Sequence, residues 1–124
     1  MAGAALPWAP EESSMATIYQ RDVIEKVVAN LPLLGAIEDG FVAHAQGRVV
    51  VPPVGELTFQ DPPGDTHIKY GYIKDDDVFV IKIASGFYEN PTRGLESGSG
   101  CMLVLSQETG QLCSILLDEG YLTD

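Results

Sequence analysis

The sequence predicts an α+β fold in which two N-terminal helices pack on one face of a mostly antiparallel sheet of about six strands. Between residues 21 and 45 the apolar residues recur with a helical period of about 3.6 residues. From Arg48 onward they alternate along short runs separated by turn residues, which is typical of strands joined by hairpins. A chain of 124 residues with 45% apolar content has the size and composition of one globular domain.

The chain is expected to begin with a tail and a short helix. Residues 1–16 are rich in alanine and proline, and we expect them to form a disordered tail before a folded domain over residues 17–124. The first helix is expected from Arg21, with Asp22 as its N-cap. Its buried face is expected to carry four residues with helical spacing, Ile24, Val27, Val28 and Leu31.

A second helix is expected after Pro32, which suits the first turn of a helix. Asn30 is the expected N-cap, and Gly47 is expected to end the helix. The residues expected to face the core are Leu34, Ile37, Phe41 and Ala45.

The rest of the chain is expected to form strands, over residues 49–51, 56–59, 66–72, 78–84, 102–105 and 112–117. The third and fourth should pair as a hairpin across the polar turn 74–77, and the last two as a second hairpin. Residues 61–64 and 87–100 are predicted loops, because they concentrate proline, glycine, asparagine and serine.

The charge balance excludes some classes of partner. Seven basic and 18 acidic residues give a net charge of −11, and an anionic surface repels phosphate backbones, so we expect no nucleic-acid partner. No apolar run approaches the roughly 18 residues of a membrane-spanning helix. No basic residue precedes the apolar start of the chain, as a secretory signal would require. We therefore expect a cytoplasmic protein without a membrane partner.

The cysteines and histidines give no metal or disulfide pattern. A turn near residues 108–110 would place Cys113 opposite residue 105 or 106, too far from Cys101 for a disulfide. The two histidines, His44 and His67, lack metal-ligand spacing. Residues 75–77 are three adjacent acids, which we interpret as a hairpin turn, with a cation site as the less favoured alternative.

Lys82 is the charged residue that most needs an explanation, because it stands inside the apolar run 78–84. An ammonium group in an apolar setting must be paired, lose its proton or reach water. Lys82 is therefore a candidate site residue. The alternative is an edge strand, in which the stem is buried and the amine lies in water.

His67 and Lys69 share one face of the strand over residues 66–72. If Lys82 lies on the paired strand, both lysines can point into one cleft and, with the imidazole nearby, hold a carboxylate. The alternative is a solvated outer face. Asn90, before Pro91, either forms a turn or supplies an amide to a ligand.

The stretch Val78-Phe-Val-Ile-Lys-Ile-Ala-Ser-Gly-Phe-Tyr-Glu-Asn-Pro91 resembles the ornithine cyclodeaminase/mu-crystallin family. Members carry a strand with a central lysine, then an aromatic residue and an asparagine. Three later stretches are also similar to that family, namely the loop and strand over 94–105, the hairpin turn 106–110 and the domain exit 115–123. Together with the two helices and the Val-Pro-Pro strand, the resemblance covers about residues 17–124.

The resemblance implies a domain that supplies substrate contacts and the dimer interface. In complete members a Rossmann domain that binds NAD or NADP follows it. Members deaminate and cyclise ornithine to proline or reduce cyclic imino acids, and some mainly bind thyroid hormone or NADPH. The resemblance implies that Lys82 is the catalytic lysine beside a small amino or imino acid, with Lys69, His67 and Asn90 as substrate-binding residues. It also implies a homodimer formed through the sheet.

Two departures from the family pattern affect these expectations. The family's early strand carries an arginine shortly after its proline, whereas this chain reads Val51-Pro-Pro-Val-Gly-Glu-Leu57, so Lys69 is the expected substitute cation. The chain also ends at Asp124, before the family's Arg-Thr-Ala-Ala helix. We therefore expect the Rossmann domain, and with it every cofactor-binding residue, to be absent from this chain.

The function expected from these features is that of the N-terminal part of an NAD(P)-dependent enzyme of ornithine cyclodeaminase type. The chain would contribute carboxylate binding and dimer contacts and would be inactive alone. The alternative is a non-enzymatic module of mu-crystallin type that binds a small ligand or forms oligomers.

Overall fold

The computed structural model describes residues 16–123. Its elements are β1 (Thr17–Gln20), α1 (Arg21–Val28), α2 (Leu33–Ala45), β2 (Val49–Val50), β3 (Gly55–Gln60), β4 (Pro63–Ile73), β5 (Val78–Phe87), β6 (Gly98–Ser106) and β7 (Leu112–Leu117), with the 3-10 helices η1 (Asn90–Arg93) and η2 (Tyr121–Thr123). The predicted disordered tail lies outside the described residues except for Ala16.

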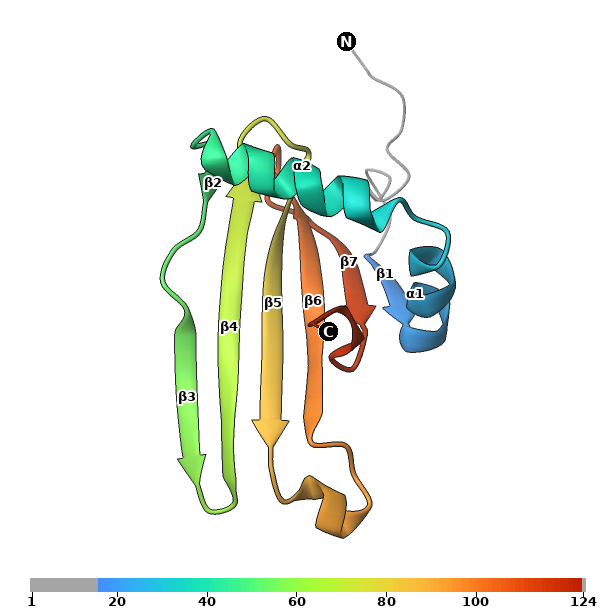
Figure 1. Cartoon of the computed structure of the whole chain (residues 1–124), viewed down its shortest axis with the longest axis vertical. Coiled ribbons are helices and arrows are strands. Elements are labelled where there is room, and N and C mark those ends of the chain that lie inside the picture. The colour runs from blue at the N-terminus through green and yellow to red at the C-terminus, as the bar shows by residue number, and fades with distance from the viewer. Residues whose placement is uncertain (1–15, 124) are drawn as a thin grey trace.

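The strands form one seven-stranded sheet in the order β1-β7-β6-β5-β4-β2, and β3 also pairs with β4 (Figure 1). All strand pairs are antiparallel except β1 with β7. The predicted α+β fold with a mostly antiparallel sheet is therefore confirmed, with one strand more than expected. The additional strand is β1, which is only four residues long and has too little alternation to be recognised in the sequence.

Both predicted hairpins are confirmed. β4 pairs with β5 from Gly64↔Phe87 to Tyr72↔Phe79, and β6 pairs with β7. The β4–β5 hairpin is longer than predicted, because residues assigned to loops continue the ladder. Its additional part includes Gly64, where a side chain would meet the Phe87 ring within 2.7 Å. Glycine in a strand often marks this kind of close approach.

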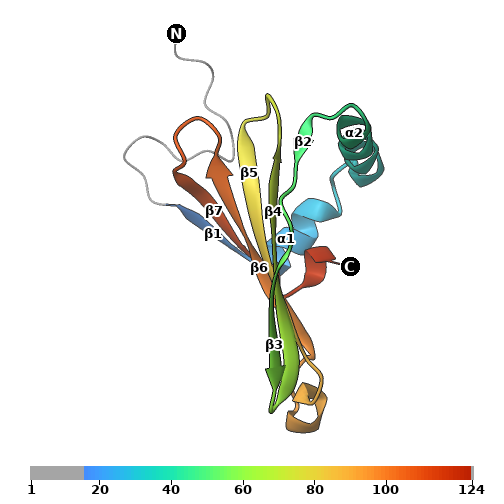
Figure 2. The same cartoon turned by 90° about the vertical axis from the view of Figure 1, so that its left-hand side faces the viewer.

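Both helices lie on one side of the sheet, which Figure 2 shows edge-on. α1 packs against β1 and β7 and buries Ile24. The predicted burial of Val27 and Leu31 is wrong, because both are 50% exposed and Leu31 lies after the end of α1. Asp22 is not the N-cap of α1, because Gln20 takes that position and Asp22 lies in the first turn. Since β1 runs directly into α1, no loop residue is left to cap it.

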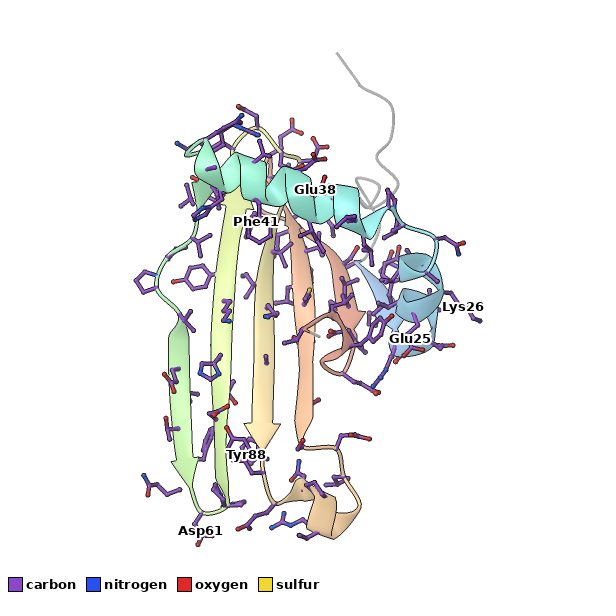
Figure 3. All side chains as sticks on the ribbon, in the orientation of Figure 1. Glu25, Lys26, Glu38, Phe41, Asp61 and Tyr88 are labelled. Atoms are coloured by element: carbon purple, nitrogen blue, oxygen red, sulfur yellow. The ribbon has the colours of Figure 1, made fainter. Side chains whose placement is uncertain are left out.

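The burial predicted for α2 is wrong. Leu34, Ile37 and Phe41 are 73%, 55% and 73% exposed, and Ala45 is exposed too. The buried residue of α2 is Ala43, so the helix meets the rest of the chain through a small side chain while its large ones project (Figure 3). Periodicity identifies an apolar stripe, but it does not show whether anything in the chain covers that stripe.

Of the two predicted ends of α2, only the C-terminal one is confirmed. Asn30 does not cap the helix, because Pro32 takes the N-cap position and the Asn30 amide donates to the Lys26 carbonyl at 2.9 Å. The predicted stop at Gly47 is confirmed, since Gly47 has the left-handed φ of 71° that glycine adopts easily.

The side of the sheet away from the helices carries an apolar surface that we call the open sheet face. Its central row crosses five strands through the directly paired residues Tyr70, Ile81, Leu103, Ile115 and Ile18. Neighbouring rows add Ile68, Ile83 and Cys101 on one side and Tyr72, Phe79 and Leu105 on the other. No described helix lies on this side (Figure 2).

Within residues 16–123 no helix has the length and hydropathy needed to cross a bilayer.

Candidate functional site

The strand register places Lys69 of β4 directly opposite Lys82 of β5. Directly paired residues project from the same face of a sheet, with their Cβ atoms about 5 Å apart. The pairing continues from Lys82 to Met102 and Leu116, and Leu116 contributes with Ile24 to a cavity between α1 and the sheet. The two lysines therefore lie on the helix-bearing face, opposite the open sheet face.

No carboxylate of the described residues forms an ion pair with either lysine. Lys82 is half-buried and Lys69 is exposed. Like charges directly opposite each other on a sheet are destabilising. An anion bound between the two ammonium groups would remove this repulsion and accept a charge-assisted hydrogen bond from each.

His67 lies two residues from Lys69 on the same strand face, between two acids. Its Nε2 is 3.5 Å from Glu56 Oε1, and its Nδ1 is 3.7 Å from Asp65 Oδ1. Asp65 also accepts a hydrogen bond from the hydroxyl of Tyr88, so the ring of His67 belongs to a polar cluster of four side chains. The contact with Glu56 depends on the pairing of β3 with β4, which the sequence does not reveal, whereas Asp65 lies two residues from His67 on β4 itself.

The hydrogen bond to Asp65 raises the pKa of Tyr88 above the ordinary value of 10.0, with smaller contributions from lost hydration and from the charges of Asp65 and Glu56. Since the folded chain holds this proton more tightly than the unfolded chain, the resulting stabilisation is complete below the unfolded pKa and is lost as the pH rises through the folded one. We expect the unfolding temperature to fall more steeply above pH 10.0 in the wild type than in Tyr88→Phe.

The titration of Tyr88 can be followed by the ultraviolet absorbance of ionised phenols. The difference between wild type and Tyr88→Phe isolates the signal of this one tyrosine. Asp65→Asn should return the titration toward the ordinary value. An unchanged titration in Asp65→Asn would contradict the assigned hydrogen bond.

Beyond Lys82 the helix-bearing face of β5 and β6 has a floor of small residues. Ala84 pairs with Gly100, and Gly86 pairs with Gly98. A side chain at Gly100 would collide with the Ile83 carbonyl oxygen, so the strands need glycine there. Above this floor lies a cavity of about 360 Å³. Ala84 lines it and stands two residues from Lys82 on the same strand face, although neither lysine lines the cavity itself.

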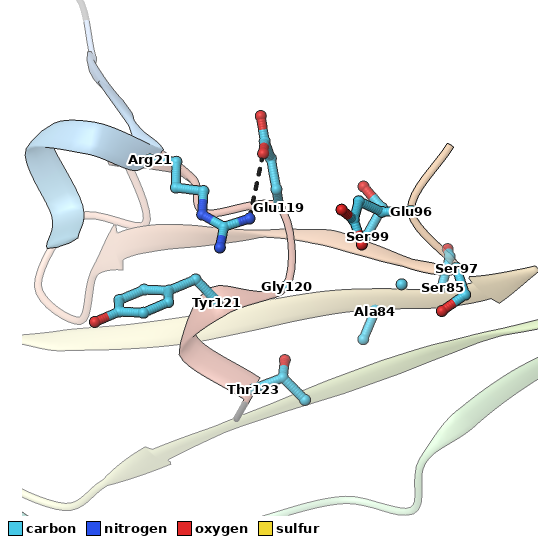
Figure 4. Close-up of a pocket in the computed structure, with 11 residues that line it drawn as sticks. Arg21, Ala84, Ser85, Glu96, Ser97, Ser99, Glu119, Gly120, Tyr121 and Thr123 are labelled. Carbon is cyan, nitrogen blue, oxygen red and sulfur yellow. Dashed lines mark hydrogen bonds and ion pairs between the residues drawn. The ribbon is translucent and has the colours of Figure 1, made fainter. Parts of the chain in front are cut away.

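The cavity wall facing this floor comes from the two ends of the sequence (Figure 4). Arg21 begins α1, and Glu119, Gly120 and Tyr121 form the turn after β7. Arg21 is the one cation among the cavity-lining residues. The sequence contains one signal for this wall, the i,i+4 spacing of Arg21 and Glu25, which form an ion pair.

The side chain of Asn90 bonds within its own loop and forms no hydrogen bond with Lys69 or Lys82 among the described residues. Its amide donates to the Glu96 carbonyl at 3.0 Å, and its own carbonyl accepts from the Leu95 N–H. These bonds close the loop after β5, which agrees with the turn alternative.

The other polar candidates behave as structural residues. Residues 75–77 lie in the β4–β5 turn, and no group of three or more potential metal ligands occurs in residues 16–123. Both cysteines are free, as predicted from the hairpin, and burial raises the pKa of the Cys113 thiol.

No family model matches the chain. Two curated proteins do. One, from Rhizobium meliloti (strain 1021) and provisionally named as the dehydrogenase RB0419, is 42% identical over 91 residues, which are 73% of this chain and 28% of that protein. The other, the uncharacterized cyclodeaminase y4tK of Sinorhizobium fredii (strain NBRC 101917 / NGR234), is 38% identical over 112 residues, 90% of this chain and 34% of that protein. The chain thus spans about a third of their length or less.

Among solved structures, the fold is similar to that of the Thermococcus litoralis Δ1-pyrroline-2-carboxylate reductase in complex with NADH and L-proline. The TM-score is 0.78 at 22% identity, over 86% of this chain and 32% of that one. At this level of identity the likeness shows a shared fold. Here too, the matched region is about a third of the longer protein.

Proposed function

Over the region that it spans, the chain belongs to the ornithine cyclodeaminase/mu-crystallin family, and from this premise we propose that it forms the substrate-binding and subunit-contact part of an NAD(P)-dependent enzyme. The enzyme would act on a small amino or imino acid, by deamination and cyclisation or by reduction. Relatives named as a dehydrogenase and a cyclodeaminase support this class of reaction.

The observation that carries the proposal is the direct pairing of Lys69 with Lys82, two residues from Ala84 on the cavity floor. Lys69 and Lys82 stand opposite each other without an acidic partner among the described residues. The carboxylate that amino and imino acids share would bridge the two ammonium groups. Lys82, the more buried of the two, would in addition hold a proton for the substrate nitrogen.

The described residues do not fit a dinucleotide cofactor. Its phosphates need a glycine-rich turn between a strand and a helix, whereas Gly98 and Gly100 lie inside β6 and α1 follows β1 without a glycine. In complete members NAD or NADP would supply the hydride chemistry. The residues of this chain would bind and orient the carboxylate.

We also propose that two copies associate through the open sheet face. Its central row of five apolar residues crosses most of the sheet, and apolar patches of this extent mark interaction surfaces. The same face favours the second candidate function, a binding or oligomerisation module of mu-crystallin type without catalysis.

The proposal is tested by calorimetric titration of the chain with L-proline and, separately, with NAD+. Two charge-assisted hydrogen bonds predict a dissociation constant for L-proline of about 1 mM, and no binding of NAD+. L-prolinamide, which lacks the carboxylate, should not bind. Equal binding of the amide would refute the carboxylate assignment, and micromolar binding of NAD+ would refute the claim that these residues lack a cofactor site.

A further inference from the structure

The turn after β7 lies beside the first residue of α1. β1 and β7 run parallel, and Gln20 pairs with Leu117, so Arg21 and Asp118 follow the two paired ends. The chain leaves both strands at the same edge of the sheet. Arg21 and Glu119, which are 98 residues apart in the sequence, therefore lie side by side in one wall of the cavity.

Arg21 holds this turn through two contacts. Its guanidinium lies 3.5 Å from Glu119 Oε2 and 5.6 Å from the centre of the Tyr121 ring, close enough for an ion pair and a cation–π contact (Figure 4). Its Nε also binds Glu25 Oε1 at 2.9 Å, which anchors the guanidinium to its own helix.

The turn itself places Glu119 at the cavity. Asp118 is 1% exposed, and its Oδ2 accepts the Leu122 N–H at 2.8 Å, which fixes the start of the turn. Glu119 has a left-handed φ of 55°, unusual for a residue other than glycine. The Glu119 side chain lines the same cavity as Ala84, the neighbour of Lys82 on the helix-bearing face of β5.

Glu119 is the carboxylate of this turn that lines the cavity, on whose floor Ala84 stands two residues from Lys82. A side-chain carboxylate tethered in the cavity acts at an effective concentration of about millimolar or more. It could occupy the ammonium of Lys82 in place of a free ligand. In the structure Glu119 instead pairs with Arg21.

We propose that Arg21 is a positioning residue that holds Glu119 away from Lys82 and so keeps the carboxylate site open. The inference rests on the proposed function. It assigns to Arg21 a role in ligand affinity, which is distinct from holding α1 against the turn.

The test is a double-mutant cycle of Arg21→Met and Glu119→Gln, with L-proline as the probe and calorimetry as the measurement. Arg21→Met should weaken binding about three- to tenfold, because a released carboxylate at an effective concentration about two to nine times the dissociation constant raises the apparent constant by that ratio plus one. Glu119→Gln in the same chain should restore binding to within about twofold of wild type, since no competitor remains.

A merely structural role would not show this rescue, because the double variant lacks the ion pair as well. Arg93→Met, at an arginine of η1 that has no ion pair with a described residue, is the matched control and should bind as wild type does. Thermal unfolding of each variant checks that it is folded.

The outcomes separate the two proposals. If the wild type binds L-proline and Arg21→Met binds it equally well, or if the double variant stays weak, this inference is overturned and the proposed function stands. If the wild type does not bind L-proline, the proposed function fails and the inference fails with it.

Discussion

Replacing Lys82 by methionine should abolish most L-proline binding and at the same time make the folded chain more stable. Each hydrogen bond between a charged donor and a carboxylate contributes about 1.5–3 kcal/mol, so the dissociation constant should rise at least about tenfold. Stability should increase by about 0.5 kcal/mol, because the repulsion between two directly opposed ammonium groups is removed. Methionine has a similar length and lies beside Met102, its partner on β6.

Calorimetry and chemical denaturation measure the two effects on the same sample. Lys74→Met is the matched control, because Lys74 is an exposed lysine of the β4–β5 turn, away from the pair. It should leave both quantities unchanged within error. A loss of stability in Lys82→Met would contradict the claim that Lys69 and Lys82 repel each other, and unchanged affinity would exclude Lys82 from the site.

A lysine at position 103 should separate the proposed dimer into monomers. Leu103 is the middle residue of the five-strand row on the open sheet face. In a twofold-symmetric interface each substitution occurs twice, and each copy would bury an unpaired charge. The dissociation constant of the dimer should therefore rise by about a hundredfold or more. Analytical ultracentrifugation over a range of concentrations measures it.

Leu34→Lys is the control that distinguishes the two apolar surfaces of the molecule. Leu34 is 73% exposed on α2, on the other side of the sheet, so its substitution should leave the dimer intact. Tyr70→Lys, at the partly exposed end of the same row as Leu103, provides a second interface variant that perturbs the fold less. Dissociation by Leu34→Lys alone would place the contact on α2, and a monomeric wild type would refute the dimer.

The sequence predicted the parts of the fold that depend on local patterns. The alternation around Tyr70 and the apolar run around Lys82 identified the β4–β5 hairpin, and the turn before Leu112 identified the next one. Both patterns depend only on residues close in the chain. The expectation that the two cysteines would remain apart came from the same hairpin geometry.

The errors occurred where a distant part of the chain decides the outcome. β1 exists because β7 supplies its hydrogen-bonding partner, and four residues contain no sign of that partner. The stripe of α2 is apolar as predicted, but no described segment covers Phe41, and this depends on tertiary packing alone.

The candidate site likewise contains residues that local patterns identified and contacts that they did not. Lys69, Lys82 and His67 were selected from their places in strand patterns, and the register puts them on one face. Their roles stay predictions until a ligand is measured. Asp65 stands two residues before His67 on β4, so the strand alternation places it on the same face as His67. The contacts of His67 with Glu56 and of Arg21 with Glu119 join segments that have no common local pattern, so no sequence signal indicated them.

The most direct test of the carboxylate site is to locate bound L-proline by backbone amide NMR of the isotope-labelled chain. We expect the largest shift changes on Lys69, Lys82 and Ala84 and no response from Lys26 and Lys74. Saturating shifts confined to another region, or no shifts at millimolar ligand, would contradict the assignment of the lysine pair as a carboxylate site.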